Sequence, residues 1–284
     1  MTALVAAAAI VGGCGSAARP ARQVVSTAPA APARPVFTVG VVGAVPFEVA
    51  GVAVVHGSLT RVVGNPLVLV EAGRVSPVEL ALVARANPAT DFAVIGGTAG
   101  RRPLRNVAGV LVRAGDAAYL SGTVAALVAH ATGTQRPTVT LVGPAGTGVV
   151  TAFRRGVSDA APGVSATATA AGPDATLCKE AALAAIDAGA VAVVGTDDAC
   201  AAGVLAAAAE RNVVGESLVA DFELPSVAVA AVVQAAAAGH PYRHEDVRFG
   251  YRAGAVGIVH LDPLVPTAVA IQARAAAQRL AEGR

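Results

Sequence analysis

Residues 107–130, VAGVLVRAGDAAYLSGTVAALVAH, join a strand-forming run directly to a long helical one. The run 107–112 is rich in valine and has the length of a buried strand. The stretch 115–130 then predicts a helix that is apolar on most sides, and such a helix is buried inside its protein. The other predicted strands and helices form one series before this helix and another after it.

Short apolar runs alternate with Ala-rich helical stretches on both sides of it. Continuous Val-rich strands alternating with helices predict an α/β fold, with parallel strands buried on both faces. Two such series, separated by a buried helix, indicate two lobes around a cleft, and ligands of open α/β sheets bind beyond the carboxyl ends of the strands. One helix is expected over 76–86, and its start is indicated by Ser76, Pro77 and Glu79. The other predicted strands are 36–42, 66–70, 91–95, 138–142, 164–168, 191–194 and 213–214.

The composition indicates a folded chain and does not favour a membrane-spanning or a nucleic-acid-binding protein. Of the 284 residues, 55% are hydrophobic, which indicates a folded chain rather than a disordered one. Beyond the N-terminus no apolar run reaches the roughly 20 residues that a membrane-spanning helix needs. The net charge is only +2, and no basic stripe with aromatic residues suggests nucleic acid as a partner.

The N-terminus resembles an exported lipoprotein. An apolar run ends in Val11-Gly12-Gly13-Cys14, which is similar to the bacterial lipobox, although no Lys or Arg precedes the run. This predicts a signal peptide over 1–13 and a diacylglycerol on the Cys14 thiol, with a third acyl chain on its amine. Residues 14–35 are rich in Pro and Ala, so they predict an extended tether. The expected location is the extracytoplasmic face of the cell membrane.

Two further cysteines, Cys178 and Cys200, form an even pair in an oxidising compartment, where a disulfide is permitted. We expect them on successive helices of one lobe. The sequence leaves open whether they are bonded or are two small buried residues that never meet. Neither lies in a Cys-x-x-Cys motif or beside a basic residue, so no catalytic role is expected.

No motif supports an enzyme. The loop 143–148, GPAGTG, follows a strand and opens a helix, but it matches neither phosphate-binding signature. Residues 240–246 hold His240, His244, Glu245 and Asp246, but Pro241 interrupts helical spacing, so a polar turn is expected instead of a metal site. Residues 215–217 begin like a nucleophile elbow without its second glycine. We therefore expect no cofactor and no metal.

A family resemblance is carried by Asn106-Val107-Ala108-Gly109-Val110, by Asp116-x-x-Tyr119-Leu120-x-Gly122 and by Phe153-x-x-Gly156. These passages resemble the basic membrane protein family, purine-nucleoside-receptor-type lipoproteins that serve ABC importers. Residues 188–191, and 254–258 as a closing strand, add weaker matches. The resemblance implies a type I periplasmic-binding fold, a small-molecule ligand held between two lobes, and an ABC permease as partner. It divides the chain into a first lobe (36–113), a hinge helix with the second lobe (114–240), and a return segment (241–284).

The ligand site departs from the family pattern. The family's Asp after the first strand is missing, and only an aromatic, Phe47, remains there. Gly96 stands where the family has Asp after its third strand, and Gly215-Glu216-Ser217 replaces its Gly-x-Asp for the ribose hydroxyls. The first lobe also lacks one strand–helix unit between Phe47 and Pro66 in this interpretation. The expected ligand contacts are Phe47, Gly96, Gly143, Asp197, Asp198, Glu216 and Ser217.

Two functions fit these observations. One is a lipid-anchored receptor that delivers a small polar solute, nucleoside-like or sugar-like, to an ABC permease. The other is a degenerate member of the family that binds no solute and acts in the cell envelope by interaction or sensing.

Overall fold

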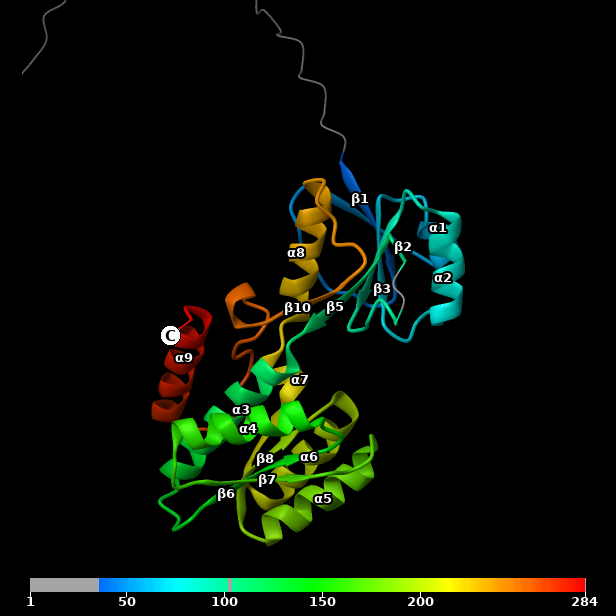
Figure 1. Ribbon diagram of the computed structural model, residues 1–284. Helices are drawn as coiled ribbons and strands as arrows, with labels where there is room; N and C mark the ends of the chain where they lie inside the picture. The colour runs from blue at the N-terminus through cyan, green and yellow to red at the C-terminus, as the bar shows by residue number, and fades with distance from the viewer. Residues whose placement is uncertain (1–35, 102–103, 284) are drawn as a thin grey trace, which may run out of the picture. The chain divides into compact units, whose positions relative to one another are not determined.

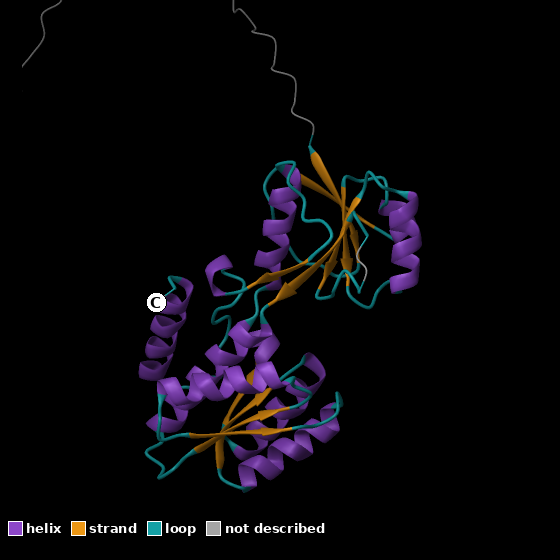
Figure 2. Ribbon diagram, in the orientation of Figure 1, coloured by secondary structure: helices purple, strands orange, loops and turns teal. Residues whose placement is uncertain are grey.

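A computed structural model of the chain describes residues 36–101 and 104–283 (Figure 1). The predicted signal peptide, Cys14 and the tether lie outside these residues. From Val36 onward the chain forms one compact unit containing two parallel sheets, and each sheet carries helices on both faces (Figure 2). The α/β fold with two lobes that the sequence predicts is thereby confirmed.

The first lobe is built on a six-stranded sheet in the order β10-β5-β4-β3-β1-β2, all parallel. Helix α8 packs on one face, and helices α1 and α2 pack on the other. The strands are β1 (Phe37–Val42), β2 (Val52–His56), β3 (Leu67–Glu71), β4 (Asp91–Ile95), β5 (Val107–Val112) and β10 (Asp246–Phe249). The helices are α1 (Leu59–Val62), α2 (Pro77–Ala86) and α8 (Pro225–Ala237).

The second lobe is built on a four-stranded parallel sheet in the order β7-β6-β8-β9. One face carries α3, α4, α7 and α9, and the other face carries α5 and α6. The strands are β6 (Thr138–Val142), β7 (Ser165–Thr169), β8 (Ala190–Gly195) and β9 (Val214–Ser217). The helices are α3 (Ala114–Ala131), α4 (Thr147–Ala160), α5 (Ala175–Asp187), α6 (Asp198–Arg211), α7 (Leu218–Phe222) and α9 (Thr267–Ala281).

Helix α3 is the buried helix that the sequence predicts, and it crosses α4 at very short range. A side chain at Gly122 would collide with the backbone carbonyl of Phe153, and one at Gly156 would collide with that of Tyr119. Glycine at both positions therefore lets the two backbones touch, which explains two of the residues that carry the family resemblance.

Three sequence expectations need correction. The unit thought to be missing between Phe47 and Pro66 is present as β2 and the one-turn helix α1. Helix α1 has only four residues, too few to show helical periodicity, whereas β2 has the length and the valine content of the other predicted strands and could have been predicted. The closing strand is β10, not 254–258, where Val256 forms only an isolated bridge with Glu223. Helix α8, included in the range 114–240, packs in the core of the first lobe.

The chain passes between the lobes three times: from β5 to α3, from α7 to α8, and from β10 towards α9. The second of these connections carries Glu223. Its backbone bridge to Val256 and the hydrogen bond from Leu224 N–H to the carbonyl of Ala255 (2.9 Å) tie it to the third connection. Two of the three connections therefore run side by side.

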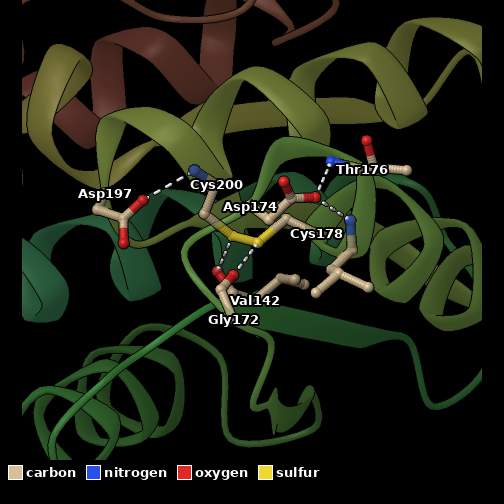
Figure 3. The surroundings of a disulfide bond; sticks show 8 residues. Val142, Gly172, Asp174, Thr176, Cys178, Asp197 and Cys200 are labelled. Atoms are coloured by element: carbon tan, nitrogen blue, oxygen red, sulfur yellow. Dashed lines mark hydrogen bonds between the residues drawn. A yellow bond between two sulfur atoms is a disulfide. The ribbon is translucent and has the colours of Figure 1, made fainter.

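The structure joins Cys178 of α5 to Cys200 of α6 in a disulfide, with Cα atoms 5.2 Å apart (Figure 3). Both residues are fully buried. Each lies in the first turn of its helix, Cys178 four residues after the cap Asp174 and Cys200 three residues after the cap Asp197. Asp174 accepts hydrogen bonds from the N–H groups of Thr176 and Leu177, and Asp197 accepts one from that of Cys200 (2.8 Å). The bond therefore fastens the starts of two neighbouring helices.

Replacing both cysteines with alanine should lower the free energy of unfolding by about 3 kcal/mol, the loop-entropy value for a closed loop of this order of length. Chemical denaturation under oxidising conditions measures the loss. The free energy of unfolding of reduced wild-type protein should lie between those of the double variant and the oxidised wild type. Each free thiol can donate to a nearby carbonyl, Cys178 to that of Gly172 (3.3 Å) and Cys200 to that of Val142 (3.2 Å). Equal stability of the double variant and the oxidised wild type would contradict a native disulfide.

Candidate functional site

The carboxyl ends of the second lobe's strands bring several predicted contacts to one edge. Gly143 follows β6, Asp197 and Asp198 follow β8, and Ser217 ends β9. Because β6, β8 and β9 are adjacent and parallel, these residues share the same edge of the sheet. Gly143 has a φ of 127°, and a side chain there would meet the Cys200 sulfur at 2.7 Å, so this position accepts only glycine.

The two aspartates at this edge have different roles. The Asp197 carboxylate accepts the hydrogen bond from Cys200 N–H and caps α6, so its main task is structural. Asp198 is the first residue of α6, and its side chain is exposed. Among the described residues, no hydrogen bond or ion pair engages its carboxylate. Asp198 is therefore the one of the pair that is available to a ligand.

Glu223 joins this edge and was not predicted from the sequence. It follows α7, at the connection between the lobes, and among the described residues no side chain pairs with its carboxylate. Burial, followed by the negative charge of Asp198, raises the pKa of Glu223 to about 7. The carboxyl group therefore titrates near neutral pH. Its only local sequence signal is a single acidic residue ahead of Leu224-Pro225, and that pattern is too common to indicate a site.

Glu216 does not lie where a ligand contact was expected. Only 1% of the residue is exposed, and neither carboxyl oxygen has a hydrogen-bond partner within the described part of the chain. Side chains alternate along β9, and Glu216 shares a face with Val214, which packs in the core of the second lobe. Burial, followed by the charges of Asp221 and Asp262, raises its pKa well above the usual value, so the fold favours the protonated form of this carboxyl group.

Two acids cover the outer edge of β9 on either side of Glu216. Asp262 accepts a hydrogen bond from Gly215 N–H (3.1 Å), and Asp221 accepts one from Ser217 N–H (2.7 Å). The Ser217 hydroxyl accepts from the Ala220 N–H and caps α7, so this side chain is also occupied in the fold. Gly215 and Ser217 are thus engaged in holding the strand edge and α7 in place, while Glu216 between them makes no side-chain hydrogen bond.

Phe47 and Gly96 lie in the first lobe. Phe47 is half-buried, packs against the core under α8, and lines a pocket of about 570 Å³ with Ser226 and Val227 of that helix. The residues lining this pocket include none of the second-lobe candidates. Gly96 follows β4 with a φ of 75°, and its N–H donates to the carbonyl of Val110 (2.8 Å).

A second residue that sequence reasoning missed is Glu71, at the end of β3. Its carboxylate accepts hydrogen bonds from Ala44 N–H and from the Arg74 guanidinium, both at 2.8 Å. These bonds lower the pKa of Glu71. Glu71 thereby fixes the start of the loop that carries Phe47.

Neither a metal centre nor a membrane-spanning helix is found within the described ranges. No group of three His, Cys, Asp or Glu side chains there could hold a metal ion. Asp246, from the predicted polar turn, instead begins β10 and accepts a hydrogen bond from Ala99 N–H (2.7 Å). None of the helices in this part of the chain combines the length and the hydropathy needed to cross a bilayer.

Comparisons with known proteins agree with this architecture. The family model of PnrA-like ABC transporter substrate-binding proteins matches residues 77–223, more than half of the chain. No curated protein sequence matches significantly. Similar solved structures include an ABC transporter solute-binding protein from Aeropyrum pernix K1, which has 18% identity and a TM-score of 0.58 and covers 87% of this chain and 92% of that one.

Two further structures have the same fold. A solute-binding protein of an ABC transporter system from Conexibacter woesei DSM 14684 has 20% identity, a TM-score of 0.62 and coverage of 87% and 97%. A transcriptional activator of the comK gene from Bacillus halodurans has 14% identity, a TM-score of 0.66 and coverage of 87% and 99%. At these identities the likeness establishes the fold alone, which is the type I periplasmic-binding fold.

The buried Glu216 generates a pH-dependent prediction. Its folded-state pKa lies above the unfolded value of 4.5, so the folded state holds the proton more tightly. The stability that comes from this proton is complete below the unfolded pKa and is lost as pH rises towards the folded pKa, by up to about 1.4 kcal/mol per pH unit. Glu216→Val should therefore gain stability relative to wild type as pH increases from about 5 to 8.

Urea unfolding at several pH values measures this difference. Glu216→Gln is the matched control, because it keeps a buried polar group of the same shape that does not titrate. It should show the same change in pH slope as Glu216→Val while gaining less stability overall. Parallel pH profiles for wild type and both variants would show that Glu216 ionises normally.

Proposed function

We propose that this chain, which belongs to the family of PnrA-like ABC transporter substrate-binding proteins, captures a small polar solute at the carboxyl edges of its two sheets and delivers it to an ABC permease. Members of this family work outside the cytoplasm as binding proteins, not as enzymes. The observation that carries the proposal is the pair Asp198 and Glu223, two carboxyl groups without protein partners among the described residues. Asp198 follows the carboxyl end of β8, where ligands of this fold bind, and Glu223 follows α7, close enough for the charge of Asp198 to raise its pKa.

The chemistry of this edge favours a solute that donates hydrogen bonds. Asp198 and Glu223 can only accept when they are ionised, and no described basic side chain pairs with either of them. A hydroxyl-rich or amine-bearing solute would satisfy both groups. Phe47 would supply an apolar surface from the first lobe, since part of its ring remains accessible in the pocket it shares with α8.

Ordinary purine nucleosides fit this edge poorly. The family's aspartates after the first and third strands are absent here. The Ser217 hydroxyl is engaged in capping α7, and Glu216 is buried. A lost hydrogen bond to a charged group costs about 1.5–3 kcal/mol. Two such losses weaken binding several hundred-fold or more, because 1.4 kcal/mol corresponds to about a factor of ten.

Isothermal titration calorimetry with guanosine, adenosine and inosine should therefore detect weak binding or none. A thermal-shift panel of sugars, polyols and amino compounds then searches for the solute, since a ligand at 100 times its Kd adds about 2.7 kcal/mol of stability. Submicromolar affinity for a purine nucleoside would contradict this assignment of the ligand class. A panel without any stabilising compound would favour the second candidate function, a degenerate envelope lipoprotein, for which the missing aspartates are the specific observation.

Glu223→Gln is the matched variant for any solute that this panel identifies. The ionised carboxylate forms as pH rises through about 7, so a solute that donates to it should bind more tightly at pH 8 than at pH 6. Glu223→Gln should lose this pH dependence, whereas Glu48→Gln, on the exposed loop of the first lobe, should retain it.

Lipid anchoring through Cys14 is part of the proposal, and it rests on the sequence of the N-terminus. Cys14→Ala should move the protein from the membrane fraction to the soluble fraction, because two or more acyl chains are needed for stable attachment and the variant carries none. Immunoblotting of fractionated cells after a high-salt wash tests this. Cys178→Ala is the control and should stay with the membrane. A Cys14→Ala protein that also remains there would exclude this anchor.

A further inference from the structure

The connection between β4 and β5 differs from an ordinary crossover. Parallel strands are usually joined through a helix that covers one face of the sheet. Here residues 96–106 join the two strands, and the described part of this segment, all but 102 and 103, forms no helix. On the face that carries α1 and α2, the loop residues Ala99 and Leu104 therefore pack against Val94 and Val107, where a crossover helix would otherwise lie.

A pocket of about 460 Å³ lies between this loop and α2, within the size range of small-molecule sites. Its floor includes Val70, Val94 and Val107, which are buried residues of three adjacent strands. The wall formed by α2 consists of Pro77, Leu80, Ala81 and Arg85. From the first to the last of these residues the helix rises about 12 Å. The pocket is therefore elongated, and its floor is apolar.

The charged residues that line the pocket leave it positive. Arg85 lies near the end of α2 and Arg101 lies in the loop, and both residues are exposed. Neither side chain forms an ion pair or a hydrogen bond with any described residue. Glu71 is the only acidic residue among the described lining residues, and its carboxylate is paired with Arg74 (2.8 Å). Two guanidinium groups therefore remain available to an anion beside an apolar floor.

We propose that this pocket binds a single-chain amphipathic anion, which is an alkyl chain ending in one carboxylate or phosphate group. The alkyl chain lies along α2 over the buried valines, where each CH₂ group that leaves water favours binding. The anionic group lies beside Arg85 and Arg101, because a planar guanidinium can donate two parallel hydrogen bonds to carboxylate or phosphate oxygens. The lining residues include neither Asp198 nor Glu223, so this proposal stands independently of the solute site.

Isothermal titration calorimetry of the full chain with octanoate, decanoate and decyl phosphate, all below their micellar concentrations, tests the proposal. Each buried CH₂ group raises affinity about fourfold, so decanoate should bind roughly 15-fold more tightly than octanoate. Octanol and octylammonium match octanoate in length. Both should bind more weakly than octanoate, because the alcohol carries no charge for the guanidinium groups and the ammonium is repelled by them.

Variants of the two arginines test the role of charge. Arg85→Gln and Arg101→Gln should each weaken decanoate binding several-fold and leave octanol binding unchanged, because only the anionic group loses a partner. Arg61→Gln is the matched control, since Arg61 is an exposed arginine of α1 that does not line the pocket. It should bind decanoate like wild type.

Ala81→Phe tests the location, because it places a ring in the pocket from α2 and should abolish binding of every chain length. Leu82→Phe is its control, since Leu82 is 61% exposed and does not line the pocket. Circular dichroism during thermal unfolding shows that both variants are folded.

Three results overturn the proposal. One is a wild type that binds neither decanoate nor decyl phosphate, even if it binds anionic vesicles. Another is binding that Ala81→Phe leaves unchanged. The third is equal affinity for octanol and octanoate.

Discussion

The close crossing of α3 and α4 is the constraint on which the second lobe depends. At Gly122 and Gly156 the backbones touch, so any side chain would force the two helices apart. Helix α3 continues directly from β5 of the first lobe, and its apolar residues fill the core over β6 and β8. A displacement of α3 would therefore disturb both the packing of the second lobe and the connection to the first. This explains why a helix at the centre of the chain carries the most recognisable pattern in the sequence.

Acidic side chains lie at the carboxyl ends of the second sheet's strands and along its edge strand β9, and they do different things there. Asp197 caps a helix, and Asp221 and Asp262 receive the free N–H groups of β9. These groups are satisfied by the fold, whereas Asp198 and Glu223 have no partner among the described residues. Glu216 is a different case, because its carboxyl group is buried without a hydrogen-bond partner and burial raises its pKa. Acidic residues that look equivalent in the sequence thus differ in three ways: some are bonded within the fold, some remain available to a ligand, and one is buried without a partner.

The parts of the fold that were predictable from sequence depend on local patterns. Helix α3 shows apolar residues on most sides, and Ser76, Pro77 and Glu79 place the start of α2, where the Ser76 hydroxyl accepts from Glu79 N–H (3.1 Å). Strand β10 could not be predicted, since Asp246 and Arg248 make it polar and only its partner β5 selects the strand conformation. The raised pKa of Glu223 likewise depends on its burial in the folded chain and then on Asp198, which is distant in the sequence. The burial of Glu216 was within reach, because alternation along β9 places it on the same face as Val214.

The shortened connection between β1 and β3 links the unusual features of the first lobe. A nine-residue loop joins β1 to β2, and only one helical turn follows β2. The loop returns along the sheet, so Phe47 packs under α8 and is held in the lobe instead of projecting from it. The same short connection leaves both faces and the outer edge of β2 partly exposed. The short connection therefore both sets the position of Phe47 beneath α8 and leaves β2 exposed at the edge of the first sheet.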